Sequence, residues 1–153
     1  MKRPWAKMGI FTTAIILLFI QCTPYQSAGF TGGFSETKLD ENVWKVQFKG
    51  NGYTNLERAS DLCLLRSAEL CLINGYTHFA TVESDKYVSQ HQYTTSSRKT
   101  GRSTHTVSKP RTAYTIVCYE EKPEEFSYNA RFLLKSLMAK YELVGYPGYI
   151  TAG

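Results

Sequence analysis

The sequence predicts a small α+β domain in which a mixed sheet of three or more strands packs against one long central helix and a C-terminal helix. Three observations indicate this class. The chain has 153 residues, which is the length of one domain. A strand-like segment with alternating apolar and polar residues precedes a long stretch without proline or glycine. Two further segments rich in strand-forming residues and a second helical segment follow, so the expected order is strand, helix, strand, strand, helix.

The first strand is expected in the segment VWKVQFK. Its apolar residues Trp44, Val46 and Phe48 alternate with polar ones, which is typical of a strand with one buried face. A turn follows, and Thr54 and Glu57 have the spacing of a capping box. The central helix is therefore expected to begin at about Asn55.

The central helix should continue to Ile73 and stop at Asn74 and Gly75, a pair suited to a left-handed C-terminal cap. Its leucines lie around most of the circumference, so it must be covered on more than one side. Arg66 and Glu69 have a three-residue spacing that permits a solvated surface pair. We interpret these two residues as structural rather than catalytic.

The second half of the chain provides two strands and a helix. Residues 76–83 are the second expected strand, parallel to the first because a helical crossover separates them. Residues 113–120 are the third. Ser127 is expected to cap a helix over residues 128–141, whose apolar residues are Phe132, Leu133, Leu137 and Met138.

Residues 86–111 are basic and rich in Ser and Thr, and they contain no acid. Such a composition lacks the apolar area that folding requires, which favours a solvated, mobile hairpin insertion. The alternative is a patch for an anionic component of the cell envelope, such as lipid head groups or lipopolysaccharide. Nucleic acid is not expected as a partner. The patch would consist of Lys86, Arg98, Lys99, Arg102, Lys109 and Arg111.

The N-terminus is expected to be a bacterial signal peptide, residues 1–21. A basic segment precedes thirteen apolar residues, 8–20, and a membrane span needs about 20. Residues 22–36 would then be a tether, and residues 37–149 the folded domain. Two alternatives remain open, namely a single permanent span and cleavage at the small residues 27–29. Without the three basic residues of the signal, 15 basic residues remain against 13 acidic ones, a net charge of +2 that argues only weakly for a polyanion partner.

Cys22 looks like the acylated cysteine of a lipobox. It lies directly after the apolar run, and a polar segment follows it. Phe19 and Gln21 depart from the usual pattern, which has Leu three residues before the cysteine and a small residue directly before it. Acylation at Cys22 would supply enough apolar area for stable membrane attachment.

Three segments between Cys22 and Phe79 carry a family resemblance: CTPYQSAGFTGGFSETKLDENVWKVQFKGNGYT, ERASDLCLLRSAEL and NGYTHF. They resemble an uncharacterised family of small proteobacterial envelope lipoproteins. The resemblance implies lipid attachment at Cys22 and supplies no catalytic role. Because Thr23 occupies the sorting position in place of Asp, it also implies the periplasmic face of the outer membrane.

Residues that could perform chemistry are few. The three histidines, His78, His91 and His105, lack the short spacing of metal ligands. Cys63 and Cys71 lie about 12 Å apart on one helix, too far for a disulfide. Pairing of Cys118 with either of them remains open. We expect no cofactor and no metal.

Two function classes follow. The favoured one is a non-enzymatic envelope lipoprotein with a structural or binding role. The alternative is a small periplasmic enzyme or ligand carrier whose polar site is assembled from residues distant in sequence. The candidates for such a site are Tyr53, Arg66, Glu69 and His78. A closed, polar-lined pocket would favour the alternative.

Overall fold

The computed structural model of the chain describes residues 25–97 and 101–143. The predicted signal peptide and Cys22 lie outside this range. The described elements are β1 (Gly33–Asp40), β2 (Val43–Lys49), α2 (Leu56–Ile73), β3 (His78–Ser97), β4 (Gly101–Tyr119), β5 (Tyr128–Asn129) and α3 (Ala130–Lys140). The predicted α+β class, with its long central helix and C-terminal helix, is confirmed.

The described strands form one five-stranded sheet in the order β1-β2-β4-β3-β5. The mixed sheet that we predicted is wrong, because every neighbouring pair of these strands is antiparallel. β2 and β3 do run in the same direction, as a helical crossover requires. However, β4 lies between them, so they do not pair with each other.

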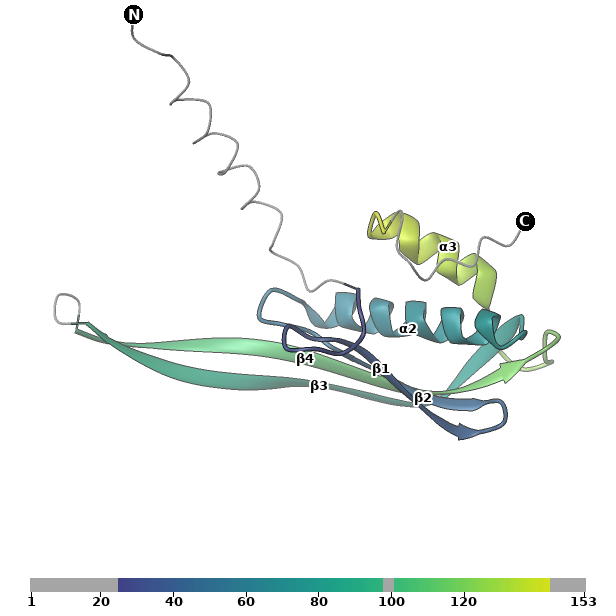
Figure 1. The fold of residues 1–153 in the computed structure, drawn as a ribbon, viewed down its shortest axis with the longest axis horizontal. Coiled ribbons are helices and arrows are strands. Elements are labelled where there is room, and N and C mark those ends of the chain that lie inside the picture. Colours follow the sequence, from purple (N-terminus) through teal and green to yellow (C-terminus); the bar gives the residue numbers. More distant parts are fainter. Residues whose placement is uncertain (1–24, 98–100, 144–153) are drawn as a thin grey trace, which may run out of the picture.

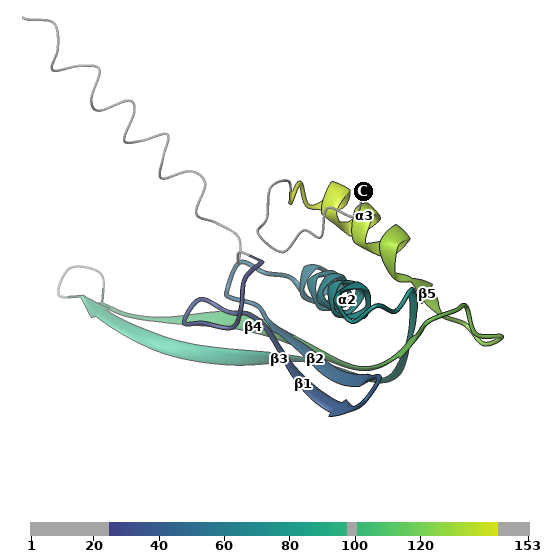
Figure 2. The same ribbon diagram turned by 45° about the vertical axis from the view of Figure 1, so that its right-hand side comes forward.

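One face of the sheet is covered by α2, and α3 lies on the far side of α2 (Figures 1 and 2). Trp44, Val46 and Phe48 of β2 are buried on this covered face, as their alternation predicts. From β4, Ile116 and Cys118 face the same way and are fully buried. The fully buried Leu62 and Leu65 of α2 complete the core, which explains why this helix is apolar on more than one side.

Both helix N-termini are capped by residues other than those we predicted. Asn55 caps α2 by accepting a hydrogen bond from the Arg58 backbone N–H, in place of the expected capping box. Asn129 caps α3 in the same way, in place of Ser127. Asparagine is as effective a cap as serine. The observed caps therefore lie one and two residues after the predicted ones. At the other end of α2, Gly75 has the predicted left-handed conformation, with φ of +85°.

The segment that we predicted to be a tether is part of the domain from Tyr25 onwards. Tyr25 is 3% exposed and belongs to the core. Residues 33–40 form β1, which pairs with β2 along its length. Gly33, with φ of +124°, permits residues 26 and 27 to lie against β1, since a Cβ there would be 2.4 Å from the Gln26 carbonyl oxygen.

Beyond the end of β2, the strands β3 and β4 continue as a two-stranded ribbon, which we call the arm (residues 88–97 and 101–110) (Figure 1). The predicted hairpin is therefore present, but it is not an insertion. Each of its strands is the direct continuation of a core strand, and the register runs unbroken from Val88 opposite Pro110 to Ser97 opposite Gly101. Most of its side chains are exposed, as their polar composition indicates.

Candidate anion-binding site

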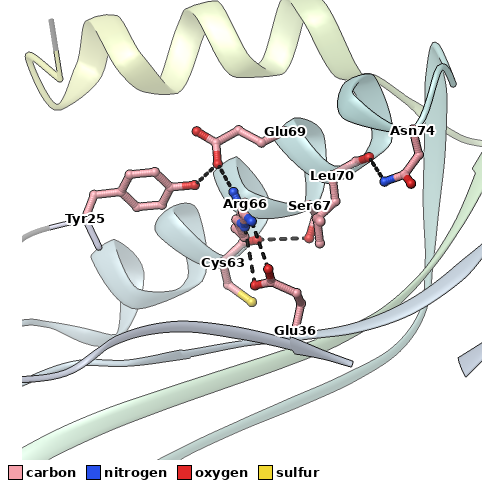
Figure 3. A network of polar contacts seen from close by, with 8 residues as sticks. All are labelled: Tyr25, Glu36, Cys63, Arg66, Ser67, Glu69, Leu70 and Asn74. Carbon is pink, nitrogen blue, oxygen red and sulfur yellow. Dashed lines mark hydrogen bonds and ion pairs between the residues drawn. The ribbon is translucent and has the colours of Figure 1, made fainter. Parts of the chain in front are cut away.

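Two of the four predicted polar-site residues meet in a network on α2 (Figure 3). The Arg66 guanidinium donates to Glu69 at 2.8 Å and to Glu36 of β1 at 2.8 Å. The Tyr25 hydroxyl also donates to Glu69. The side chains of Arg66 and Glu69 are 15% and 8% exposed. The solvated surface pair that we predicted is therefore wrong, because β1 and Tyr25 cover it.

The charges of this network stabilise one another. Burial would lower the pKa of Arg66, but hydrogen bonds and attraction from Glu36 and Glu69 outweigh it and raise that pKa. Burial, reinforced by the Glu69 carboxylate, raises the pKa of Tyr25. Both groups thus stay in their ordinary protonation states, and the network joins the N-terminal segment, β1 and α2. Sequence reasoning missed Tyr25 and Glu36, because neither lies near Arg66 in the chain.

The other two predicted polar-site residues lie elsewhere. Tyr53 is 74% exposed in the turn before α2. His78 begins β3, beyond the other end of α2, where its Nδ1 is 2.8 Å from the Thr77 hydroxyl. The structure therefore does not assemble the four residues into one site.

All three described cysteines, Cys63, Cys71 and Cys118, are buried free thiols, so neither disulfide left open by the sequence is present. The Cys63 thiol donates to the Val46 carbonyl oxygen, with sulfur and oxygen 3.3 Å apart. Burial raises the pKa of the Cys63 thiol to about 12. This thiol is protonated at neutral pH and is not a nucleophile.

A basic hollow lies where the arm leaves the sheet. Its volume is about 270 Å³, and three cationic side chains line it: Lys49 from β2, and Lys109 and Arg111 from β4. Ser89 and His91 of β3 face it from the neighbouring strand. We call these five residues and the adjoining turn Gly29–Gly32 the basic hollow.

The strand register explains why these side chains meet. Lys49 lies directly opposite Arg111, and Ser89 lies directly opposite Lys109. Residues opposite each other, or two apart on one strand, share a face of a sheet. Two cations directly opposite across a strand pair destabilise a sheet. An anion between them would remove this repulsion.

The cations of the basic hollow have no acidic partner among the described residues. No Asp or Glu lines the hollow, and no described ion pair involves Lys49, Lys109 or Arg111. Arg111 donates instead to the Tyr87 hydroxyl and lies 5.3 Å from the centre of that ring. By contrast, Lys45, on the same face of β2, lies 4.0 Å from Asp85.

The turn Gly29–Gly32 forms one wall of the hollow. It is closed by backbone hydrogen bonds in both directions between Gly29 and Gly32. The Gln26 side chain donates to the Thr31 hydroxyl at 3.1 Å and holds the turn against the preceding segment. Phe30, at the tip, is fully exposed.

The six residues of the predicted anionic patch do not form one surface. Lys109 and Arg111 lie in the hollow, whereas Lys86 and Arg102 lie on the opposite face of the β3–β4 pair. Lys86 lies over the Tyr114 ring at 5.6 Å. Arg98 and Lys99 lie outside the described residues. Sequence reasoning missed Lys49, which the alternation of β2 places on the face away from the helix.

The opposite end of the sheet has the opposite charge. A second hollow of about 670 Å³ lies there, and its acidic residues are Glu41, Glu120 and Glu121. Lys122 is the one cation among the residues that line it. The two hollows differ in charge, so an anion would bind preferentially at the arm.

No protein-family model, curated protein or solved structure matches the chain. Among the described residues, no helix is both long enough and apolar enough to cross a bilayer. The same residues contain no cluster of three or more metal-binding side chains.

Proposed function

We propose that the protein is an exported lipoprotein, acylated at Cys22, whose domain binds an anionic group of the cell envelope in the basic hollow. One observation carries the binding role: Lys49, Lys109 and Arg111 converge on one hollow that has no acidic residue in its lining. Folding brings these like charges together at a cost in stability. A bound anion offsets that cost.

The buried Tyr25 supports processing at Cys22 rather than at the small residues 27–29. A chain cut at residues 27–29 would lose Tyr25, which is 3% exposed and donates a hydrogen bond to Glu69. Cleavage directly before Cys22 keeps this contact. We further propose that the acylated protein lies at the periplasmic face of the outer membrane, as the family resemblance implies.

Anion binding is tested by calorimetric titration of the full chain, in mild detergent, with inorganic pyrophosphate. We expect Arg111→Gln or Lys109→Gln to weaken binding by about 10- to 150-fold, because a charge-assisted hydrogen bond contributes about 1.5 to 3 kcal/mol. Lys135→Gln is the matched control, since it removes the same charge from the exposed surface of α3. Equal weakening by Lys135→Gln, or no binding by the unsubstituted chain, would contradict the binding role.

Anchoring is tested by the intact mass of the protein in the membrane fraction. The expected mature chain starts at Cys22 and carries acyl chains, and it stays with membranes after a high-salt wash. Cys22→Ala should accumulate as the uncut precursor. Normal release of this variant by cleavage at residue 29 or beyond would contradict acylation at Cys22. Fractionation of the acylated protein with the inner membrane would contradict only its predicted location.

A further inference from the structure

We infer that the anion bound in the basic hollow is the phosphate of a lipid head group, in the same membrane leaflet that holds the acylated Cys22, and that Phe30 enters the interfacial layer beside it. This inference rests on the proposed function and names the ligand of that site. It follows from the short distance between the anchor and the fold, and from the residues that border the hollow.

The chain between the anchor and the folded domain is short. Cys22 is three residues before Tyr25, so their Cα atoms are at most about 11 Å apart in a fully extended chain. Tyr25 is fixed to α2 through its hydrogen bond to Glu69, and its ring packs 4.9 Å from that of Phe34. An acylated Cys22 therefore holds this end of the domain close to the lipid head groups.

The segment after Tyr25 leads directly to the hollow. Phe34 donates its backbone N–H to the Gln26 carbonyl at 2.8 Å, and Ala28 donates to the Phe34 carbonyl at 2.6 Å. The Gln26 side chain holds Thr31 of the turn. The turn Gly29–Gly32 is thus fixed relative to Tyr25, and the same turn lines the basic hollow. A continuous series of contacts thus links Tyr25, through the turn, to the basic hollow.

The composition of this region suits a membrane interface. Phe30 is 110% exposed and stands at the tip of the turn, next to three cations. Aromatic side chains partition into the interfacial layer, and each basic residue near an anionic surface contributes about a fivefold gain in binding. A free phosphate ion would use the cations but leave the exposed Phe30 without a role. Because the exposed Phe30 lies beside the three cations, a lipid is favoured as the source of the phosphate.

The test uses the full acylated chain reconstituted into lipid vesicles, with Phe30→Trp as a fluorescent probe. The vesicles are phosphatidylcholine alone or phosphatidylcholine mixed with phosphatidylglycerol, each with lipids brominated near the head group. The signal of the unsubstituted protein, which contains the buried Trp44, is subtracted. Phe126→Trp is the matched control, because Phe126 is 75% exposed and lies next to Glu124 and Glu125 at the acidic end.

We expect the brominated lipids to quench Trp at position 30 in vesicles that contain phosphatidylglycerol, and to leave Trp at position 126 unquenched. Combining Phe30→Trp with Lys49→Gln, Lys109→Gln and Arg111→Gln should abolish the quenching in these vesicles. Equal quenching at positions 30 and 126 would overturn the inference. Quenching that survives the triple substitution would overturn it as well.

The outcomes also separate the inference from the proposed function. If pyrophosphate binds to the full chain and Trp at position 30 stays unquenched, the lipid assignment fails and the anion site stands, with a soluble or polymeric anion as its ligand. If pyrophosphate does not bind to the full chain, the proposed binding role fails together with the inference. Quenching at position 30 together with weak pyrophosphate binding supports a lipid head group in preference to a free anion.

Discussion

The two halves of β4 differ in their surroundings although they share one strand and one pairing partner. From Thr112 to Ile116 every residue is buried, whereas from Gly101 to Thr106 every residue is exposed. From Thr115 outwards to Gly101 the register with β3 is unbroken, and its one irregularity lies at the inner end, between Thr81 and Glu83. The difference arises because α2 and β2 cover the inner half and end before the arm begins. Backbone pairing alone therefore extends the ribbon, and burial is confined to the inner half.

This comparison indicates where the stability of the domain resides. Apolar burial contributes about 25 cal/mol per Å², and it is concentrated between α2 and the inner half of the sheet. An isolated two-stranded ribbon is only marginally stable in water. Substitutions in the inner half should therefore have large effects on the free energy of unfolding, and changes in the arm should have small ones.

Leu65→Ala should have the largest effect. Leu65 is fully buried on α2, and its truncation leaves a cavity that costs about 2 to 5 kcal/mol of unfolding free energy. Urea unfolding measures this cost. Ile73→Ala is the matched control on the same helix, because Ile73 is 51% exposed and should lose less than about 1 kcal/mol. Equal costs at both positions would show that α2 is not the centre of the core.

Glu69→Gln should have the second largest effect. It removes a carboxylate that accepts from both Arg66 and Tyr25 in a mostly buried position. A hydrogen bond to a charged group contributes about 1.5 to 3 kcal/mol, so we expect a loss in that range by urea unfolding. Glu57→Gln, on the exposed side of the same helix, should have little effect. A negligible loss of unfolding free energy in Glu69→Gln would indicate that Arg66 and Glu69 form a solvated pair, as the sequence predicted.

Much of the fold could be predicted from periodicity. The alternation of β2 and the long stretch without proline or glycine before Asn74 identified the first core strand and α2. Both signals are local, because each depends only on the types of residues two to four positions apart in the chain. The positions of strands in the sheet depend instead on contacts between distant segments. For this reason the insertion of β4 between β2 and β3 escaped prediction.

The candidate site was harder to predict than the fold. Lys109 and Arg111 were recognised as basic, but their meeting with Lys49 depends on the register of β4 against β2. Tyr25 and Glu36 complete the Arg66 network from a segment whose glycines suggested a linker. In both cases the missing information was the pairing of strands. The composition of residues 86–111 also suggested a mobile segment. That prediction rested on how little apolar area the segment can bury, and it did not include the backbone hydrogen bonds that pair its two strands.

The buried thiol of Cys63 should make the stability of the inner half depend on pH. Its pKa is about 12 in the folded protein against an ordinary 9.0, so its contribution is fully present below pH 9 and is lost as the pH rises towards 12. Near pH 10 the loss should reach about 1.4 kcal/mol. Urea unfolding below pH 9 and near pH 10 measures this loss. Cys63→Ala is the control, and its free energy of unfolding should depend less on pH. An unchanged profile in Cys63→Ala would show that the thiol ionises equally in both states.

Shortening the arm should have the smallest effect. Replacing residues 92–106 with a short turn that contains glycine would join His91 to Val107, which lie opposite each other, and would leave the basic hollow in place. Of the residues removed, the side chains described at 92–96 and 101–106 are all exposed, so little burial is lost there. Each removed backbone hydrogen bond contributes little net stability, and each removed residue no longer has to be ordered at a cost of about 1 to 2 kcal/mol. These opposing contributions should nearly cancel.

We therefore expect the unfolding free energy of the shortened protein to change by less than about 1 kcal/mol, within the usual range for substitutions outside the core. Hydrogen exchange of the full-length protein provides an independent measurement. Amides of the arm should exchange faster than those of Thr112 to Ile116, since exposed hydrogen bonds open locally. Unfolding of the shortened protein, or equally slow exchange in both halves of β4, would contradict the division between inner half and arm. Such a result would mean that the ribbon, despite its exposed side chains, belongs to the same cooperative unit as the core.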